Sequence, residues 1–242
     1  MYLENINGPS DIQKLNLDEL RILADETRDA LIHKISLAGG HNGPNLGMVE
    51  VTTALHYVFH SPIDKFVFDV SHQSYPHKIL TGRKQAFLDE EHFHDVTGYT
   101  NPEESEHDFF TIGHTSTSIS LALGLAKGRD LNHGKENIIA IIGDGSLSGG
   151  EALEALDYAG EYRNNLIIIV NDNDQSIAEN HGGLYKNLNK IIYIFLTIFL
   201  YLLKCPQSLI LSALRAFFFC GKPHISRSIF LYFRYQAWLK SW

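Results

Sequence analysis

An aspartate between two glycines follows an apolar run, and this combination could hold a cation beside a phosphate. The run Ile138-Ile139-Ala140-Ile141-Ile142 predicts a buried strand, and Gly143-Asp144-Gly145-Ser146 predicts the turn from that strand into a helix. Glycines let the backbone approach a phosphate closely, and a helix N-terminus offers amide donors. Asp144 would then hold the cation. Taken alone, the motif is better interpreted as an ordinary strand-to-helix turn.

A second polar loop follows the next predicted strand. The apolar segment 166–170 runs into Asn171-Asp172-Asn173-Asp174-Gln175-Ser176, so Asn173 lies 29 residues after Asp144. Neighbouring strands of a parallel sheet end side by side, and ligands bind beyond their carboxyl ends. A carboxylate, an amide oxygen and a backbone carbonyl, with two diphosphate oxygens and a water, would give the oxygen octahedron that Mg²⁺ prefers. The two motifs together predict a metal-bridged diphosphate.

The elements that must position these loops alternate between helix and strand. Helical spacing of apolar residues predicts four helices, at 16–37, 48–59, 114–129 and 151–162. Apolar runs predict strands at 65–70, 138–142 and 166–170. Residues 84–112 are polar and irregular, which predicts a long loop over a site. The alternation predicts an α/β fold, with a parallel sheet flanked by helices on both faces.

Charge divides the chain at residue 190. Residues 1–190 contain all 28 acidic side chains and 14 basic ones, a balance that argues against nucleic-acid binding. Both cysteines lie after residue 190, so the first part has no disulfide framework. The N-terminus shows no secretory signal, and a cytoplasmic protein is expected.

Residues 191–242 have a different character from the rest. They contain six basic residues, no acidic ones, and two apolar runs at 191–203 and 208–220. Both runs are shorter than the roughly 17–25 residues of a membrane-spanning helix. We expect a first domain at 1–190, followed by a hydrophobic tail that is either an out-of-frame translation or a weak membrane anchor.

The paired motifs resemble the fingerprint of thiamin diphosphate-dependent enzymes. Further segments resemble the N-terminal domain of the 1-deoxy-D-xylulose-5-phosphate synthase family in one register, from about residue 8 to residue 188. These segments are Gly40 to Val58, Asp69 to Arg83 and Gly113 to Ser120. The resemblance implies that the chain binds thiamin diphosphate and Mg²⁺.

The resemblance also implies roles for individual residues. Asp144 and Asn173 would bind Mg²⁺ through their side chains, and Gln175 through its backbone carbonyl. His41 and His114 would be catalytic. The residues expected to contact the cofactor are His72, His114, Thr115, Ser116, Gly143, Asp144, Gly145, Ser146 and Asn173.

The reaction implied by the resemblance joins pyruvate to glyceraldehyde 3-phosphate, with loss of carbon dioxide. Its product, 1-deoxy-D-xylulose 5-phosphate, is a precursor of isoprenoids and thiamin. The chain is expected to be inactive until a pyrimidine-binding domain is supplied in cis or in trans, and an intact enzyme is expected to be a homodimer. Two alternatives are half of a split transketolase-like enzyme and a membrane-tethered cofactor-binding protein without catalysis.

Three departures from the family pattern leave the expected cofactor unchanged but affect the expected substrate. Ser71 stands where the family usually has glycine, Asn42 to Asn45 form an unusual link between His41 and Leu46, and Pro102-Glu103-Glu104 lacks an arginine that is common there. Phosphorylated acceptors are usually held by arginine or lysine. A paralogue acting on another sugar or 2-oxo acid is therefore a competing hypothesis.

Overall fold

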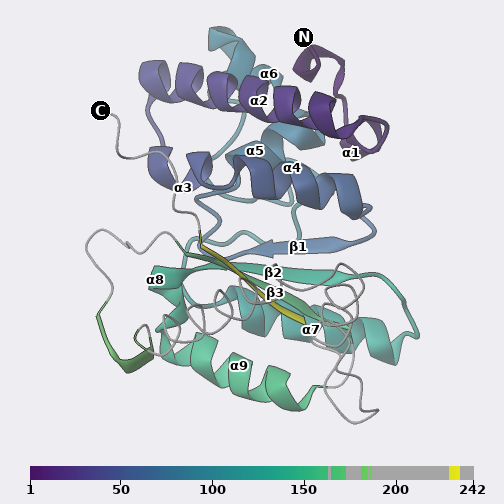
Figure 1. Cartoon of the computed structure of the whole chain (residues 1–242), viewed down its shortest axis with the longest axis vertical. Coiled ribbons are helices and arrows are strands. Elements are labelled where there is room, and N and C mark those ends of the chain that lie inside the picture. The colour runs from purple at the N-terminus through teal and green to yellow at the C-terminus, as the bar shows by residue number, and fades with distance from the viewer. Residues whose placement is uncertain (163–164, 173–180, 185, 187–228, 235–242) are drawn as a thin grey trace, which may run out of the picture.

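A parallel sheet with helices on both faces organises the chain (Figure 1). The computed structural model describes residues 1–162, 165–172, 181–184, 186 and 229–234. The strands lie in the order β1-β2-β3-β4, and every neighbouring pair is parallel. They are β1 (Lys65–Phe68), β2 (Ile138–Gly143), β3 (Ile167–Asp172) and β4 (Ile229–Arg234). The predicted fold class and its three strands are confirmed, and β4 adds a strand from the segment after residue 190.

The helices form two layers that follow the order of the chain (Figure 1). One layer contains α1 (Pro9–Ile12), α2 (Leu17–Ala38), α3 (Asn42–Leu46), α4 (Val49–Val58), α5 (Tyr75–Lys78) and α6 (Gln85–Leu88). The other contains α7 (Ser118–Leu131) and α9 (Gly150–Glu161), and α8 (Asp144–Leu147) follows β2 at the edge of the sheet. Short helical turns complete the described part at η1 (Leu3–Asn5), η2 (Ile79–Arg83) and η3 (Glu90–His92).

Successive side chains of β2 pack on opposite faces of the sheet. Ile138, Ala140 and Ile142 belong to the apolar cluster that includes α7 and α9. Ile139 and Ile141 pack on the other side with Phe66, Phe68 and Met48. Because a strand points successive side chains to opposite faces, an uninterrupted apolar run is what a strand covered on both faces needs.

The longest helix begins at a capping box that the sequence predicts. Asn16 Oδ1 accepts hydrogen bonds from the backbone N–H groups of Asp18 and Glu19, and Glu19 accepts one from the Asn16 N–H. These bonds satisfy amide groups that have no partner within the first helical turn. The helix ends at Gly39, whose φ of 76° lies in the left-handed region that glycine adopts readily.

The predicted loop at 84–112 is wrong in its first part. Residues 85–88 form α6, and Phe87 and Phe93 are buried, at 0% and 5% exposure. Phe87 packs with apolar side chains of the N-terminal helices. Two aromatic side chains placed six residues apart show no helical period, and the residues between them are mostly polar. The sequence pattern therefore did not predict that this segment belongs to the core.

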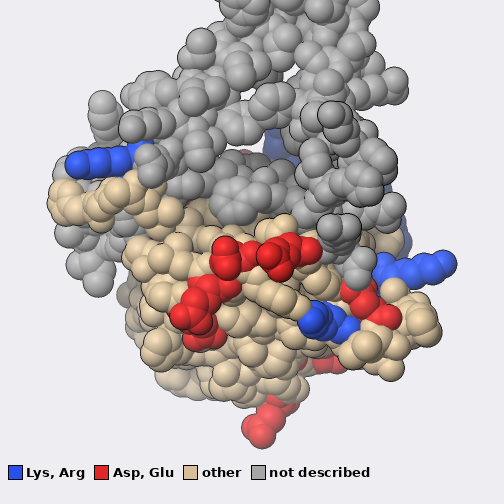
Figure 2. Space-filling model, turned by 90° about the horizontal axis from the view of Figure 1, so that it is seen from below, with Lys and Arg blue, Asp and Glu red and all other residues tan. Residues whose placement is uncertain are grey.

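Acidic side chains gather on the face formed by α9. The exposed acidic residues of that helix are Glu151, Glu154, Asp157 and Glu161. Figure 2 shows acidic side chains in red on this side of the molecule. No helix within the described ranges is long and apolar enough to cross a bilayer. The apolar runs at 191–203 and 208–220 lie outside those ranges.

Candidate functional site

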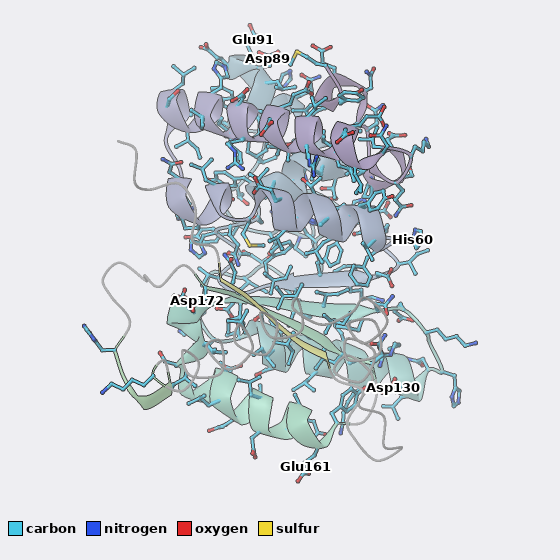
Figure 3. All side chains as sticks on the ribbon, viewed as in Figure 1. His60, Asp89, Glu91, Asp130, Glu161 and Asp172 are labelled. Carbon is cyan, nitrogen blue, oxygen red and sulfur yellow. The ribbon has the colours of Figure 1, made fainter. Side chains whose placement is uncertain are left out.

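Three aspartates mark the carboxyl edge of the sheet. Asp69 follows β1, Asp144 follows β2 and Asp172 ends β3, and all three are at least 95% buried. Gly143 pairs with Asn171, so Asp144 and Asp172 follow directly paired positions on neighbouring strands. Figure 3 shows Asp172 at the end of the sheet where α8 lies. Asn173 and Gln175 lie outside the described residues.

The segment Gly143-Asp144-Gly145-Ser146 differs in one respect from the predicted turn. Asp144 is itself the first residue of α8, which makes a single turn before α9 begins at Gly150. The backbone therefore bends twice after β2. This double bend puts Ser146 next to the segment that precedes α7, where the Ser116 hydroxyl donates to the Ser146 carbonyl at 2.7 Å.

Asp69 fixes the start of α7, and sequence reasoning gave it no role. Its carboxylate accepts hydrogen bonds from the backbone N–H groups of Ser116 and Ser118, each at 2.9 Å. A buried carboxylate needs such donors, and these bonds join the end of β1 to the N-terminus of α7. They also explain why α7 begins at Ser118 and not at 114 as predicted. The only available signal was an acidic residue directly after an apolar strand.

Close packing around Ser116 requires glycine at position 149. A Cβ atom built on Gly149 would lie 1.9 Å from Ser116 Oγ and 2.6 Å from Ser116 Cβ. Ser116 itself has a φ of 71°. A non-glycine residue in this region stores strain, which persists where surrounding bonds enforce it. The bonds from Asp69 and to Ser146 provide that enforcement.

The rings of His41 and His72, which the sequence predicts to face the cofactor and substrate, lie next to each other. Their ring centroids are 5.4 Å apart, edge to face, and the Nδ1 atom of each is buried without a hydrogen-bond partner among the described residues. Burial lowers the pKa of His72, and the neighbouring His41 lowers it further. His72 is therefore uncharged at neutral pH.

Asn45 holds the backbone of this histidine pair, and the sequence gave no reason to select it. Its side-chain amide donates to the His41 carbonyl at 2.6 Å and to the His72 carbonyl at 2.8 Å. Its Oδ1 accepts the Tyr75 N–H at 2.8 Å. Asn45 is fully buried, so a single side chain joins the start of α3 to the segment after β1.

His114 and Thr115 occupy an exposed segment before α7. His114 Nδ1 lies 2.8 Å from the Thr115 carbonyl, and a carbonyl only accepts, so Nδ1 carries the proton. The other ring nitrogen is then an acceptor in the neutral ring. No ring contact in the described part of the chain joins His114 to His41 or His72.

The groups at this edge suit a hard divalent cation and a diphosphate. Carboxylate oxygens come from Asp144 and Asp172, and hydroxyl groups from Ser146 and Thr115, and oxygen ligands are those that Mg²⁺ prefers. The unpartnered His41 and His72 nitrogens add hydrogen-bonding capacity that the described residues do not use. The residues present therefore fit a magnesium-bound diphosphate cofactor.

The fold and this polar edge define the class: the chain has the α/β fold of the transketolases. A transketolase from Leishmania mexicana matches with a TM-score of 0.56 and 22% identity, over 65% of this chain and 28% of that one. A transketolase from Pichia stipitis matches with a TM-score of 0.51 and 20% identity, over 64% and 27%. Likenesses at these identities concern the fold alone.

The sequence comparisons give the family. Residues 3–197 match the family model described as 1-deoxy-D-xylulose-5-phosphate synthase, and the chain belongs to this family. It is 51% identical over 190 residues to the 1-deoxy-D-xylulose-5-phosphate synthase of Alkaliphilus oremlandii, and 50% identical over 189 residues to that of Caldanaerobacter subterraneus. Each match covers 78% of this chain and 30% of the relative, so the chain spans less than a third of their length.

Proposed function

We propose that this chain supplies the diphosphate-and-magnesium part of a thiamin diphosphate site in a 1-deoxy-D-xylulose-5-phosphate synthase reaction. The observation that carries the proposal is the buried pair Asp144 and Asp172, at paired ends of β2 and β3. Carboxylate oxygens are hard ligands of the kind that Mg²⁺ prefers, and Mg²⁺ is usually bound by one or two carboxylates together with substrate phosphates. This edge of the sheet could therefore hold a metal that bridges to a diphosphate.

Individual residues take the following parts in this proposal. Asp144 and Asn173 bind Mg²⁺ by side chain, and Gln175 by its backbone carbonyl. The backbone of Gly143, Gly145 and Ser146 borders the diphosphate, with Ser116 and Thr115 on the opposite side. The bound cofactor supplies a nucleophilic carbon, and His41, His72 and His114 orient the substrates and move protons around it.

The substrates proposed are pyruvate and glyceraldehyde 3-phosphate, and the products are 1-deoxy-D-xylulose 5-phosphate and carbon dioxide. Turnover requires a pyrimidine-binding domain in addition to residues 1–190, whether in the same chain or another, in a homodimeric enzyme. The support is identity at about half of the aligned positions with relatives that bear this name: 51% over 190 residues and 50% over 189 residues.

Calorimetric titration tests the binding half of the proposal. The 242-residue chain is titrated with thiamin diphosphate, thiamin and inorganic diphosphate, each with and without Mg²⁺. We expect thiamin diphosphate and diphosphate to bind only with Mg²⁺, and thiamin to bind weakly under both conditions. Equal binding of thiamin and thiamin diphosphate without Mg²⁺ would contradict the proposed site.

A chimaera tests the catalytic half. Residues 1–190 are joined in frame to the part of the Alkaliphilus oremlandii relative that follows the matched region. We expect the chimaera to form 1-deoxy-D-xylulose 5-phosphate and the 242-residue chain alone to form none. Turnover by the chain alone would show that no further domain is needed, and another acceptor preferred by the chimaera would favour the paralogue hypothesis.

A further inference from the structure

Three aromatic rings surround His41. His72 and Tyr75 follow β1, with ring centroids 5.4 and 6.4 Å from that of His41, and Tyr99 comes from a separate loop at 5.5 Å. Tyr99 meets the His41 ring edge to face, at 62°. His41 Nδ1 has no hydrogen-bond partner among the described residues, so no hydrogen bond at this atom orients the imidazole, and the three rings are its close aromatic neighbours.

The loop that carries Tyr99 is pressed against His41. A Cβ atom built on Gly98 would lie 3.4 Å from the Tyr75 hydroxyl and 3.6 Å from His41 Cε1. The backbone at 98 therefore lies directly over both side chains. Tyr99 keeps 37% of its surface exposed, so part of its ring covers His41 and part faces solvent.

Hydrogen bonds fix this loop on both sides of Tyr99. On one side, the Thr97 N–H donates to Glu104 at 2.8 Å, and Glu104 is held by Lys78. On the other, the Thr100 N–H donates to Ser71 Oγ at 3.0 Å, and the Ser71 hydroxyl donates to the Ile112 carbonyl at 2.7 Å. Ser71 thus joins three segments that are distant in sequence.

Ser71 makes these bonds from a strained backbone. Its φ is 65°, in the region that favours glycine, and the preceding Val70 has a φ of 57°. Glycine would adopt this conformation without strain but has no hydroxyl group. The serine is explained by its two hydrogen bonds, which glycine could not make.

We propose that Tyr99 is a positioning residue for His41, and that Ser71 sets the place of Tyr99. The ring of Tyr99 keeps the His41 imidazole turned into the site and limits its contact with water. The hydroxyl of Tyr99 takes no part. The catalytic consequence rests on the proposed function, because it assumes that His41 acts on the substrates.

Chemical labelling of the 242-residue chain tests the positioning without any cofactor. Diethyl pyrocarbonate modifies accessible imidazoles, and peptide mass spectrometry measures its rate at His41. We expect Tyr99→Ala to raise that rate several-fold and Tyr99→Phe to leave it unchanged. Tyr57→Ala is the matched control, since Tyr57 is also 37% exposed and lies on α4. A wild-type rate in Tyr99→Ala would overturn the proposal.

Proton NMR gives an independent measure of the same geometry. The Cε1 proton of His41, assigned by its loss in His41→Gln, lies in the ring-current field of Tyr99. The chemical shift of this proton should change in Tyr99→Ala. It should change little in Tyr99→Phe, which keeps the aromatic ring. An equal displacement in Tyr57→Ala would mean that a general loosening, and not the Tyr99 ring, is responsible.

Ser71 is tested by two variants that both lack the hydroxyl. Ser71→Ala keeps the backbone strain and Ser71→Gly relieves it, so Ser71→Gly should be the more stable of the two. Both should raise the labelling of His41, because both free Thr100. Wild-type labelling in both would show that Ser71 does not hold Tyr99 in place.

Kinetics of the chimaera separate this proposal from the proposed function. Tyr99→Ala should lower kcat on the order of 10-fold with little change in KM, because misplacement of a catalytic group affects the reacting step. Tyr99→Phe should restore wild-type kcat. If the wild-type chimaera is inactive while the labelling results hold, the proposed function fails and the positioning of His41 stands. An active chimaera with unchanged kcat in Tyr99→Ala would overturn the catalytic part.

Discussion

Single residues of the site combine buried charge with backbone donors. Asp69 is compensated by two N–H groups at the start of α7, and Asp144 and Asp172 follow paired positions on β2 and β3. The first arrangement stabilises the fold, and we propose that the second binds a cation. Under this proposal, the buried aspartates at one edge of the sheet have different tasks.

Removal of the charge at Asp144 should abolish most metal-dependent binding. Asp144→Asn keeps the size of the side chain but removes the charge that a hard cation needs, so we expect Mg²⁺-dependent affinity for thiamin diphosphate to fall at least about tenfold. Calorimetry of the 242-residue chain measures this. Asp157→Asn, on the exposed face of α9, is the matched control and should bind normally. Equal losses in both variants would contradict a specific role.

Elements depend on bonds between segments that lie far apart in the chain. The capping box of α2 and the apolar period of β2 are local, so the sequence predicts both. The start of α7 at Ser118 depends on the carboxylate of Asp69, 49 residues earlier, and no local pattern contains it. The same holds for Asn45 and Ser71, which act on neighbours 27 to 41 residues away. Sequence reasoning therefore predicted the strand that precedes Asp144 and missed the residues that hold the loops.

The contribution of the Asp69 hydrogen bonds, which join β1 to α7, can be measured as a change in the free energy of unfolding. Asp69→Asn leaves one acceptor where the carboxylate had two, and the buried amide of Ser116 or Ser118 loses its partner. We expect a loss of roughly 2 kcal/mol in the free energy of unfolding, by urea titration. Asp18→Asn, on a side chain 87% exposed, serves as control and should change stability by less than about 0.5 kcal/mol. An unchanged free energy of unfolding in Asp69→Asn would show that water replaces the lost acceptor.

At the scale of the whole molecule, a buried polar network lies in the helical layer that contains α4 and α5. His56 Nε2 lies 2.9 Å from His77 Nδ1, and His77 Nε2 lies 3.0 Å from Asp108, which Arg83 also binds. The carboxylate requires the proton of His77 on Nε2, so His77 Nδ1 accepts from His56. Both rings are then neutral, in agreement with the direction in which burial lowers their pKa values.

This network should make the molecule sensitive to acid. Burial lowers the pKa of the nearby His107 to about 4, against 6.5 in an unfolded chain. Between these values the unfolded state binds a proton that the folded state does not, so the free energy of unfolding falls as pH decreases from 6.5 to 4. For His107 we expect a contribution on the order of 2 kcal/mol.

A neutral substitution isolates that contribution. His107→Asn cannot titrate, so its free energy of unfolding should decline less between pH 7 and pH 4.5 than that of the wild type. Urea titrations at both pH values measure the difference. His133→Asn, at an exposed position, should keep the wild-type slope. Parallel slopes for His107→Asn and the wild type would assign the acid sensitivity elsewhere.

The order of the layers has a consequence for synthesis on the ribosome. The cluster that contains Leu3, Leu31 and Phe87 draws all its members from the first 96 residues, whereas β1 finds its partner β2 only at 138–143. The helical layer of α1 to α6 can therefore collapse while the edge of β1 is still unpaired. A nascent chain at this stage exposes Phe66 and Phe68 without their covering strand, and this is the interval in which a chaperone would bind it.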